Sequence, residues 1–178
     1  MHPLTQFRYC PECGSSGFIV NNEKSKKCIG CGFIYYFNPS SATAAFILND
    51  KNELLICRRA KDPAKETLDL PGGFSDMNET AEEGIIREIY EETGLRATVR
   101  KYLFSLPNTY VYSGFTVHTL DLFFLCDVKY TDSHKAADDV SELMFIPLEK
   151  INPDDFGLPS VKKAVSRFVE MMNKIPDV

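Results

Sequence analysis

The chain has 178 residues, of which 44 % are hydrophobic and 25 % are charged, and its formal net charge is −5. This composition fits a soluble globular protein with one ordinary domain, or with one domain and a small appendage. It excludes disordered, collagen-like and membrane-spanning proteins, because no apolar run approaches the roughly 18 residues that a membrane helix needs.

Charge is divided unevenly along the chain. Residues 1–37 carry a net charge of +2, which leaves −7 for the remainder. A chain with a net negative charge lacks the general electrostatic footprint of a nucleic-acid-binding protein, so nucleic acid is not an expected partner. The acidic remainder is expected to need cations.

The amino terminus has no apolar stretch of the kind found in secretory signals. We therefore expect a cytoplasmic protein whose six cysteines are reduced. Cys57 and Cys126 lie in apolar runs that are typical of strands, so they are expected to be core residues.

The other four cysteines form two Cys-x-x-Cys pairs, Cys10 with Cys13 and Cys28 with Cys31, separated by fourteen residues. This spacing predicts a tetrahedral zinc–thiolate site in a small ribbon over residues 1–37, rather than a redox pair or unrelated thiols. Four thiolates leave no open position for a catalytic water, so the zinc is expected to be structural. We expect the ribbon to be a spacer or dimerisation element rather than a substrate-binding element.

The remainder predicts alternating strands and helices. Residues 41–48 and 53–59 are interpreted as a hairpin around a polar turn at 49–52, and residues 67–70 as a short extended piece that ends at Pro71-Gly72-Gly73. Further strands are predicted at three places, with a polar loop at 131–141 before the last of them: 96–106, 115–128 and 142–148.

Two helices are predicted. Residues 79–93 have an apolar face made by Ile85, Ile86, Ile89 and Tyr90, and Gly94 follows as a stop signal. Ser160 is expected to cap a final helix with an apolar stripe that faces the core.

The first helix also carries an acidic stripe. On a helical wheel, Glu88, Glu91 and Glu92 lie within a sector of roughly 100°. Carboxylates at this spacing repel one another, so the arrangement favours a positive partner, and hard oxygen ligands suit Mg²⁺ or Mn²⁺. Arg87 is placed to pair with one of these carboxylates and to hold its orientation.

The residues around this stripe follow a longer pattern. Gly73 is followed by five residues, Glu79, seven residues, Arg87-Glu88-Ile89, one residue, Glu91-Glu92, one residue and Gly94-Leu95. A chance match to these nine positions is below about 10⁻⁸ per window at average residue frequencies. The pattern resembles the Nudix box in every specified position.

The resemblance implies an α/β Nudix fold, an α/β/α sandwich with a mixed sheet, over residues 38–178 after the four-cysteine zinc ribbon. It implies that Glu88, Glu91 and Glu92 bind divalent metal, that the Gly72 carbonyl adds a ligand, and that Arg87 and Glu79 orient the helix. The implied reaction is hydrolysis of a nucleoside diphosphate linked to another moiety, in which water attacks phosphorus and metal ions neutralise charge. A homodimer is also what the resemblance suggests.

Members of the family differ in the group that deprotonates the water. Either a box glutamate or an acidic residue of a later loop, Asp138, Asp139 or Glu142, fits this role, and we prefer Glu142 among the three. Arg58 and Arg59 end a strand near the expected site, so one of them is a candidate phosphate contact. Of the two, Arg58 is the preferred candidate.

A zinc ribbon followed by a Nudix domain is similar to the NADH pyrophosphatases. These enzymes carry a downstream array, Ser-Gln-Pro-Trp-Pro-Phe-Pro-x-Ser, where this chain has Ser105-Leu-Pro-Asn-Thr-Tyr-Val-Tyr-Ser113. The serines, the first proline and one aromatic residue are kept, whereas the glutamine, the tryptophan and the later prolines are missing. The substrate is therefore left open between NADH or NAD⁺, ADP-ribose and another nucleotide sugar.

Aromatic side chains near the expected site are candidates for stacking on a flat ring of the substrate, namely Phe74, Tyr110 and Tyr112. Two other functions stay open. One is a nucleotide sensor that binds without hydrolysis, which the complete set of box carboxylates disfavours. The other is an RNA cap-removing enzyme, for which only three lysines of the ribbon provide a hint: Lys24, Lys26 and Lys27.

Overall fold

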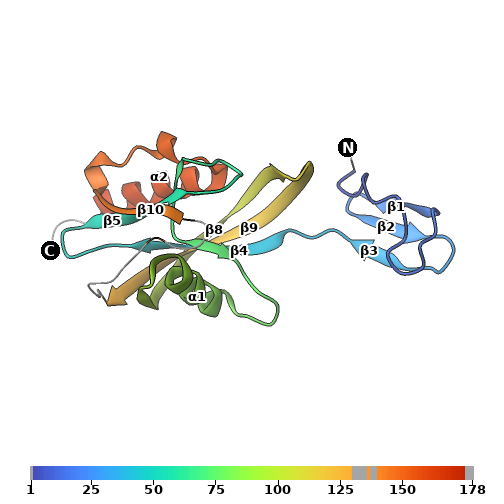
Figure 1. The fold of residues 1–178 in the computed structure, drawn as a ribbon, viewed down its shortest axis with the longest axis horizontal. Helices are drawn as coiled ribbons and strands as arrows, with labels where there is room; N and C mark the ends of the chain where they lie inside the picture. The colour runs from blue at the N-terminus through green and yellow to red at the C-terminus, as the bar shows by residue number, and fades with distance from the viewer. Residues whose placement is uncertain (1, 130–135, 137–139, 175–178) are drawn as a thin grey trace. The chain divides into compact units, whose positions relative to one another are not determined.

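A computed structural model describes residues 2–129, 136 and 140–174. The chain divides into two compact units, Met1–Pro39 and Ser40–Val178 (Figure 1). Each unit has its own core of buried side chains. None of the helices that the described residues form is long and apolar enough to cross a membrane.

The first unit is a three-stranded antiparallel sheet of β1 (Phe18–Asn22), β2 (Ser25–Cys28) and β3 (Ile34–Tyr36), in that order. Its small core consists of Cys10, Phe18 and Cys28, with Phe33 packed against them. So few buried side chains hold a unit of this size together only weakly, which fits the predicted need for a metal.

The second unit contains two sheets. The strands are β4 (Ser40–Ile47), β5 (Glu53–Arg59), β6 (Leu68–Asp69), β7 (Gly72–Phe74), β8 (Arg96–Tyr112), β9 (Phe115–Lys129) and β10 (Val140–Pro147). One sheet has the order β7-β4-β9-β8 and is mixed, because β4 runs parallel to β9 and the other pairs are antiparallel. The other sheet is antiparallel, in the order β10-β5-β6.

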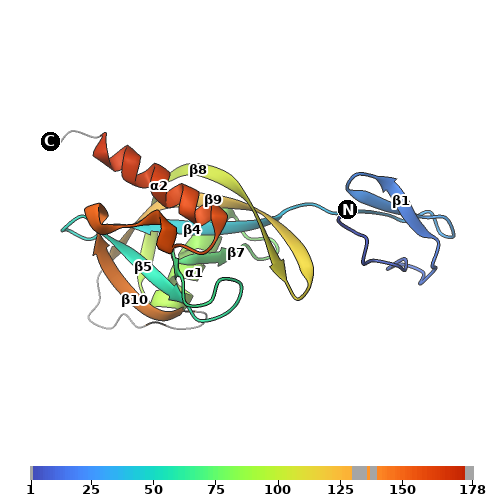
Figure 2. The same cartoon turned by 90° about the horizontal axis from the view of Figure 1, so that it is seen from above.

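Helices α1 (Ala81–Thr93) and α2 (Pro159–Asn173) lie on opposite sides of the strands (Figures 1 and 2), and the short 3₁₀ turns η1 (Leu148–Lys150) and η2 (Pro153–Asp155) precede α2. Alternate residues of β4 pack on the two faces of the mixed sheet, one set toward α2 and the other toward α1. Phe46 stacks on Phe168 of α2 with ring centroids 4.0 Å apart, whereas Ala45 and Ile47 share a cluster with Ile85 and Ile89 of α1. The predicted α/β sandwich with a mixed sheet is confirmed.

The predicted hairpin of residues 41–48 and 53–59 is wrong. Both segments are strands, but β4 belongs to the mixed sheet and β5 to the antiparallel one. The reason is that both edges of β4 are occupied, by β7 and β9, so β5 pairs with β6 and β10 instead. The two strands meet at a bridge between Leu48 and Leu54, where the chain passes from one sheet to the other.

Two expectations about the helices also need correction. In α1, Ile85 and Ile89 are buried, but Ile86 and Tyr90 are 37 % and 55 % exposed, because the helix packs on the sheet with its 85, 89 and 92 positions. Helix α2 begins at Pro159 after Leu158, and Ser160 is not its cap. The Ser160 hydroxyl donates instead to a buried carboxylate of β9.

Strand boundaries differ in two places from those expected. β8 continues to Tyr112, so the array of residues 105–113 lies mostly on a strand rather than after one. β10 begins at Val140, inside the segment for which the sequence predicts a loop. Cys57 and Cys126 are buried and free, as predicted.

Candidate active site

Helix α1 has well-defined ends that fix the position of its acidic stripe. Thr80 accepts a hydrogen bond from the Glu83 backbone N–H, and the Glu83 carboxylate accepts one from the Thr80 backbone N–H, which completes a capping box. Gly94 ends the helix in the left-handed conformation. The helix therefore starts and stops where its sequence directs, and its side chains have a fixed rotation over the sheet.

Arg87 is the centre of the carboxylate cluster. Its Nε and Nη2 donate to the two oxygens of Glu79 at 2.8 and 2.9 Å, and its Nη1 donates to Glu88 Oε1 and Glu91 Oε2, both at 2.9 Å. Nη2 also donates to the Phe74 carbonyl at 3.0 Å. One guanidinium thus ties the helix to the end of β7 and offsets the repulsion among three carboxylates.

This contact shifts the protonation of both partners. The hydrogen bonds from Arg87 hold the pKa of Glu79 at about 2. In turn, the hydrogen bonds to Glu79 raise the pKa of Arg87 above its usual value. Glu79 and Arg87 are therefore both ionised over the whole physiological range, and their ion pair persists across it.

Glu92 is held separately from the other carboxylates. It is only 8 % exposed, and its Oε2 accepts a hydrogen bond from the Gly72 backbone N–H at 3.0 Å. Beside it, Gly73 allows Glu88 to approach the strand, since a Cβ at this position would lie 2.6 Å from the Glu88 carboxylate. The sequence Gly72-Gly73 therefore positions two of the three predicted metal carboxylates through the backbone of β7.

The structure brings the predicted zinc ligands together. The four sulfur atoms of Cys10, Cys13, Cys28 and Cys31 lie within 4.8 Å of one another, with 3.7 Å from Cys10 to Cys31 and 3.6 Å from Cys13 to Cys28. Sulfurs around a tetrahedral zinc at Zn–S distances near 2.3 Å are about 3.8 Å apart. A backbone hydrogen bond from Cys31 lowers the pKa of Cys28 to about 6, whereas the neighbouring thiols raise the pKa of Cys31 to about 12. In the absence of metal, Cys28 is therefore the thiol that ionises more readily of the two.

The carboxylates of the box do not converge to the same degree. Among the residues that the structure describes, the four cysteines are the group whose ligand atoms gather this closely. Glu88 and Glu91 bond to Arg87, whereas Glu92 bonds to the backbone. Their oxygens are nonetheless the hard donors that Mg²⁺ and Mn²⁺ prefer, so the donor set fits a divalent metal.

Two adjoining cavities open beside this cluster. The first, which we term the inter-sheet cavity, has a volume of about 180 Å³ and is lined by Glu92 of α1 and by residues of both sheets, among them Asp69, Asn108 and Asp121. The second, the aromatic cavity, has a volume of about 510 Å³. It is lined by the three predicted aromatic residues, by two cations and by the two residues that follow the second cation: Phe74, Tyr110, Tyr112, Arg59, Lys61, Asp62 and Pro63.

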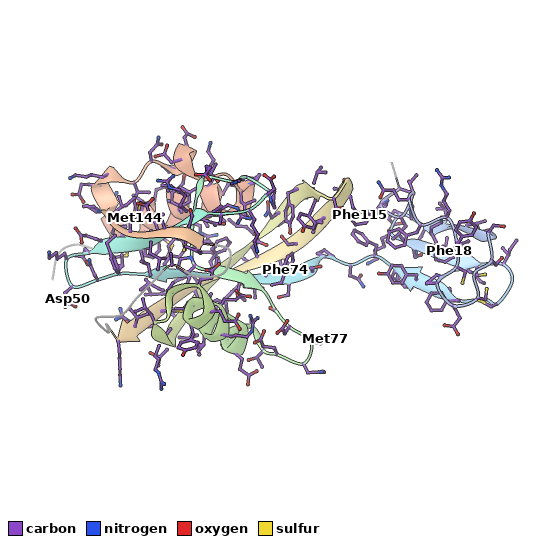
Figure 3. The ribbon with its side chains drawn as sticks, in the orientation of Figure 1. Phe18, Asp50, Phe74, Met77, Phe115 and Met144 are labelled. Carbon is purple, nitrogen blue, oxygen red and sulfur yellow. The ribbon has the colours of Figure 1, made fainter. Side chains whose placement is uncertain are left out.

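The aromatic residues come from the two edge strands of the mixed sheet, β7 and β8, which are separated by β4 and β9. Phe74, labelled in Figure 3, ends β7, and its Cα partner on β4 is Ala42. Tyr110 and Tyr112 lie on the distal part of β8. Tyr110 also lines the inter-sheet cavity, where burial and the nearby Asp121 raise its pKa. Arg59, Pro63 and Phe74 are likewise shared by the two cavities.

Buried polar residues of the inter-sheet cavity were missed by sequence reasoning. Asp69 accepts a hydrogen bond from Arg59, and its burial raises its pKa although this cation opposes the shift. Asp121 accepts hydrogen bonds from Thr119 and Ser160, both at 2.5 Å. A polar residue on the inward side of an apolar strand, such as Asp121 in Thr119–Cys126, is a sequence signal for such a site.

Among the remaining candidates that the structure describes, Arg58 and Glu142 line neither of the two cavities. Arg58 donates instead to Glu142 Oε2 at 3.0 Å and to the Glu66 carbonyl at 2.9 Å. Arg59, the other arginine considered, lines both. Asp138 and Asp139 lie outside the described residues.

A comparison of the sequence with protein families matches the NUDIX domain over residues 38–168. The chain belongs to the Nudix family. This match includes the whole of the predicted box and both sheets, and it confirms the resemblance that the box indicated.

Two relatives illustrate the range of related enzymes. An ADP-ribose pyrophosphatase of Methanocaldococcus jannaschii is 36 % identical over 118 residues, which cover 65 % of this chain and 66 % of that protein. An NAD-capped RNA hydrolase NudC of Vibrio parahaemolyticus is 27 % identical over 107 residues, which cover 60 % of this chain and 40 % of the relative. The chain thus spans only part of the length of either relative.

Solved structures share the fold. A NUDIX hydrolase from Nitrosomonas europaea superimposes with a TM-score of 0.75 at 22 % identity, covering 93 % of this chain and 92 % of the other. A UDP-X diphosphatase has a TM-score of 0.61 at 20 % identity, covering 79 % of this chain and 66 % of the other.

Proposed function

We propose that this Nudix protein is a metal-dependent pyrophosphohydrolase that cleaves the diphosphate bond of a nucleoside diphosphate linked to another moiety. NAD⁺ or NADH, ADP-ribose and nucleotide sugars are the substrates of this kind. The observation that carries the proposal is the position of Glu92, a box carboxylate that is held by the Gly72 N–H and lines the inter-sheet cavity, which adjoins the aromatic cavity.

Glu88, Glu91, Glu92 and the Gly72 carbonyl would hold Mg²⁺ or Mn²⁺. When bound, the metal supplies neutralisation of charge on the diphosphate oxygens and a lowered pKa for a bound water. The protein's own part is positional: Arg87 holds Glu88 and Glu91 at the end of β7, and the Gly72 N–H holds Glu92. Preorganised ligands of this kind need no rearrangement of the fold to bind metal.

The group that takes the proton from water is proposed to be a carboxylate of the box. Glu142, the alternative, is engaged by Arg58 and does not line either cavity within the described residues. A general base must reach the attacking water within hydrogen-bond distance, and the box carboxylates are next to the expected diphosphate position. Conversion of Glu142 to glutamine should therefore leave turnover near normal.

The aromatic cavity is proposed to bind the ring at one end of the substrate and a phosphate. Phe74, Tyr110 and Tyr112 offer faces on which a planar heterocycle stacks, and Arg59 and Lys61 offer positive charge. A nucleoside triphosphate would also satisfy the phosphate contacts, but a second ring or sugar makes better use of two cavities than a terminal phosphate does.

For the amino-terminal unit we propose structural Zn²⁺ on Cys10, Cys13, Cys28 and Cys31, because four thiolates close the coordination sphere. The six free cysteines fit a reducing compartment, so we propose that the protein is cytoplasmic. We propose a homodimer from the family resemblance, which size measurement in solution will test.

The proposed function is tested by phosphate-linked turnover with Mg²⁺ or Mn²⁺ against NADH, NAD⁺, ADP-ribose, nucleotide sugars, diadenosine polyphosphates, nucleoside triphosphates and NAD-capped RNA. Glu92→Gln serves as the inactive variant and Glu82→Gln, an exposed residue of the same helix, as the matched control. We expect one diphosphate-linked substrate to be hydrolysed at least a hundredfold more slowly by Glu92→Gln and normally by Glu82→Gln.

Each other outcome has a defined meaning. Binding of nucleotides without hydrolysis by the wild type would replace the proposal with the nucleotide-sensing function. Preferential hydrolysis of capped RNA with salt-dependent affinity would favour an RNA-directed enzyme, because phosphate contacts weaken as salt rises.

A further inference from the structure

The inter-sheet cavity contains a buried carboxamide that the fold does not satisfy. Asn108 is 5 % exposed, and its Oδ1 has no hydrogen-bond partner within the described part of the chain. The hydroxyl of Thr43, which is 3 % exposed, likewise has no hydrogen-bond partner among the described residues. Both residues line the inter-sheet cavity. Buried polar atoms are nearly always paired in native proteins, so an unpaired acceptor on a cavity wall points to a ligand that pairs with it.

The strand register explains why the neighbours do not pair with these atoms. Thr119 lies opposite Asn108 across β8 and β9, but its hydroxyl donates to Asp121 Oδ1. Thr43 has Gly73 opposite it on β7 and Leu122 opposite it on β9, and neither offers a polar side chain. The sequence thus places two polar side chains at positions where no cross-strand neighbour forms a hydrogen bond with them.

The charges around Asn108 select the chemistry of the ligand. Three buried carboxylates line the cavity, Asp69, Asp121 and Glu92, whereas Arg59 is a cation on the same wall and is paired with Asp69. Where no metal ion neutralises it, this excess of negative charge would repel a phosphate or carboxylate, so the diphosphate is expected at the metal that Glu92 would hold and not beside Asn108. A neutral or cationic group that donates hydrogen bonds is favoured.

The position of Tyr110 sets the shape of the ligand. Asn108 and Tyr110 are two residues apart on β8, so their side chains lie on the same face, about 7 Å apart along the strand. This is the length of a planar heterocycle with one substituent. A ring against Tyr110 is therefore long enough for its substituent to reach the Asn108 Oδ1.

We propose that Asn108 is a specificity-determining residue that accepts a hydrogen bond from an N–H donor on the substrate's heterocycle, either the exocyclic amine of adenine or the carboxamide of nicotinamide. This inference rests on the proposed function, because it assumes that the substrate is a nucleotide whose diphosphate lies at Glu92. It adds the residue and the chemical group by which the substrate is chosen.

The test compares pairs of substrates that differ in this donor. ADP-ribose is measured against inosine diphosphate ribose, which has a carbonyl in place of the amine, and NAD⁺ against nicotinic acid adenine dinucleotide, which has a carboxylate in place of the carboxamide. We expect wild-type kcat/KM to favour the donor-bearing member of one pair by at least tenfold, mainly through KM. The pair that shows the preference identifies the ring in the cavity.

Variants assign the preference to Asn108. Asn108→Leu keeps the approximate volume and removes the acceptor, and Asn108→Ser is the second variant in case leucine prevents folding. Thr109→Val is the matched control, because Thr109 is exposed on the opposite face of the same strand. The preference should fall below threefold in the Asn108 variants, with circular dichroism unchanged, and should persist in Thr109→Val.

A binding measurement separates this inference from catalysis. The affinities of AMP, IMP, nicotinamide mononucleotide and nicotinic acid mononucleotide are measured by calorimetry with Glu92→Gln, where no turnover is required. A preference for AMP or nicotinamide mononucleotide that is lost with Asn108→Leu supports the inference even if no substrate is hydrolysed. The inference is overturned if the wild type shows no preference within either pair, or if the Asn108 variants retain it.

Discussion

Alanine at position 73 should inactivate the enzyme without unfolding it. A Cβ on Gly73 would lie 2.6 Å from the Glu88 carboxylate, whereas ordinary van der Waals contact begins at 3.4 Å, so the carboxylate must move by about 0.8 Å. The atoms that must move are the far end of a flexible side chain, so the fold can absorb the shift. The Glu88 hydrogen bond to Arg87 Nη1, 2.9 Å long, would be displaced with it.

The expected loss of activity follows from this displacement. A misplacement of about 1 Å at a reacting centre typically lowers turnover by about 10²-fold, which corresponds to about 2.7 kcal/mol of transition-state stabilisation. The assay is kcat with Mg²⁺ or Mn²⁺ on the best substrate of the panel. It is combined with a urea unfolding curve, whose midpoint should change little.

Gly72→Ala is the matched control, since it alters the adjacent glycine. Its Cβ would overlap the backbone carbonyl of Thr43 at a φ of +151°, so a sheet strand rather than a side-chain end must shift. Backbone strain of about 1–3 kcal/mol and overpacking of a similar size should lower its unfolding midpoint clearly. If Gly73→Ala keeps the turnover of the wild type, the role given to Glu88 is refuted. If Gly73→Ala and Gly72→Ala lower the unfolding midpoint equally, the assumption that the Glu88 side chain can move aside is refuted.

Three further predictions follow from other contacts. Cys13→Ser should lose the zinc measured by atomic absorption and the unfolding transition of the first unit, whereas Glu12→Gln in the same turn should keep both; a zinc-free wild type would contradict the ribbon site. Because the pKa of Glu79 is lowered to about 2 from 4.5, its contribution to stability is complete above pH 4.5 and is lost as the pH falls toward 2. The difference in urea midpoint between wild type and Glu79→Gln should therefore shrink over that range, and a constant difference would exclude the Arg87 contact as its source. Arg59→Gln should raise KM at least tenfold whereas Arg58→Gln should not, and equal effects of the two would remove the distinction that the cavities make.

The features that could be predicted from the sequence are those encoded by local spacing. The two Cys-x-x-Cys pairs needed only short turns to bring their sulfurs together. The box placed its carboxylates on one helix, and Gly94 ends that helix as predicted, whereas the helix begins at Ala81 after the Thr80 cap and not at residue 79. Such contacts are formed by any chain with this local sequence, so the pattern alone determines them.

The features that escaped prediction depend on residues far apart in the sequence. The local sequence does not indicate that both edges of β4 are occupied by other strands. The pattern of residues 41–59 therefore favours a hairpin of β4 with β5, although these strands belong to different sheets. Ser160 has the residue type of a helix cap, but the proximity of Asp121, 39 positions away, gives its hydroxyl another acceptor. Asn108 and Thr43 look like ordinary strand residues until the register shows that their cross-strand neighbours leave them unpaired.

The position of Glu92 connects the reaction to the choice of substrate. The Gly72 N–H holds the Glu92 carboxylate at the inter-sheet cavity, and Asn108 lines the same cavity. A nucleotide whose ring satisfies Asn108 is thereby held with its diphosphate near the box, whereas a nucleotide whose ring leaves Asn108 unpaired loses both affinity and this alignment. A buried acceptor that stays unpaired costs free energy. The substrate without the donor is therefore disfavoured by this cost, as much as the substrate with the donor is favoured by its hydrogen bond. The same cavity that destabilises the free protein through an unsatisfied carboxamide is therefore the part best suited to select what the carboxylates hydrolyse.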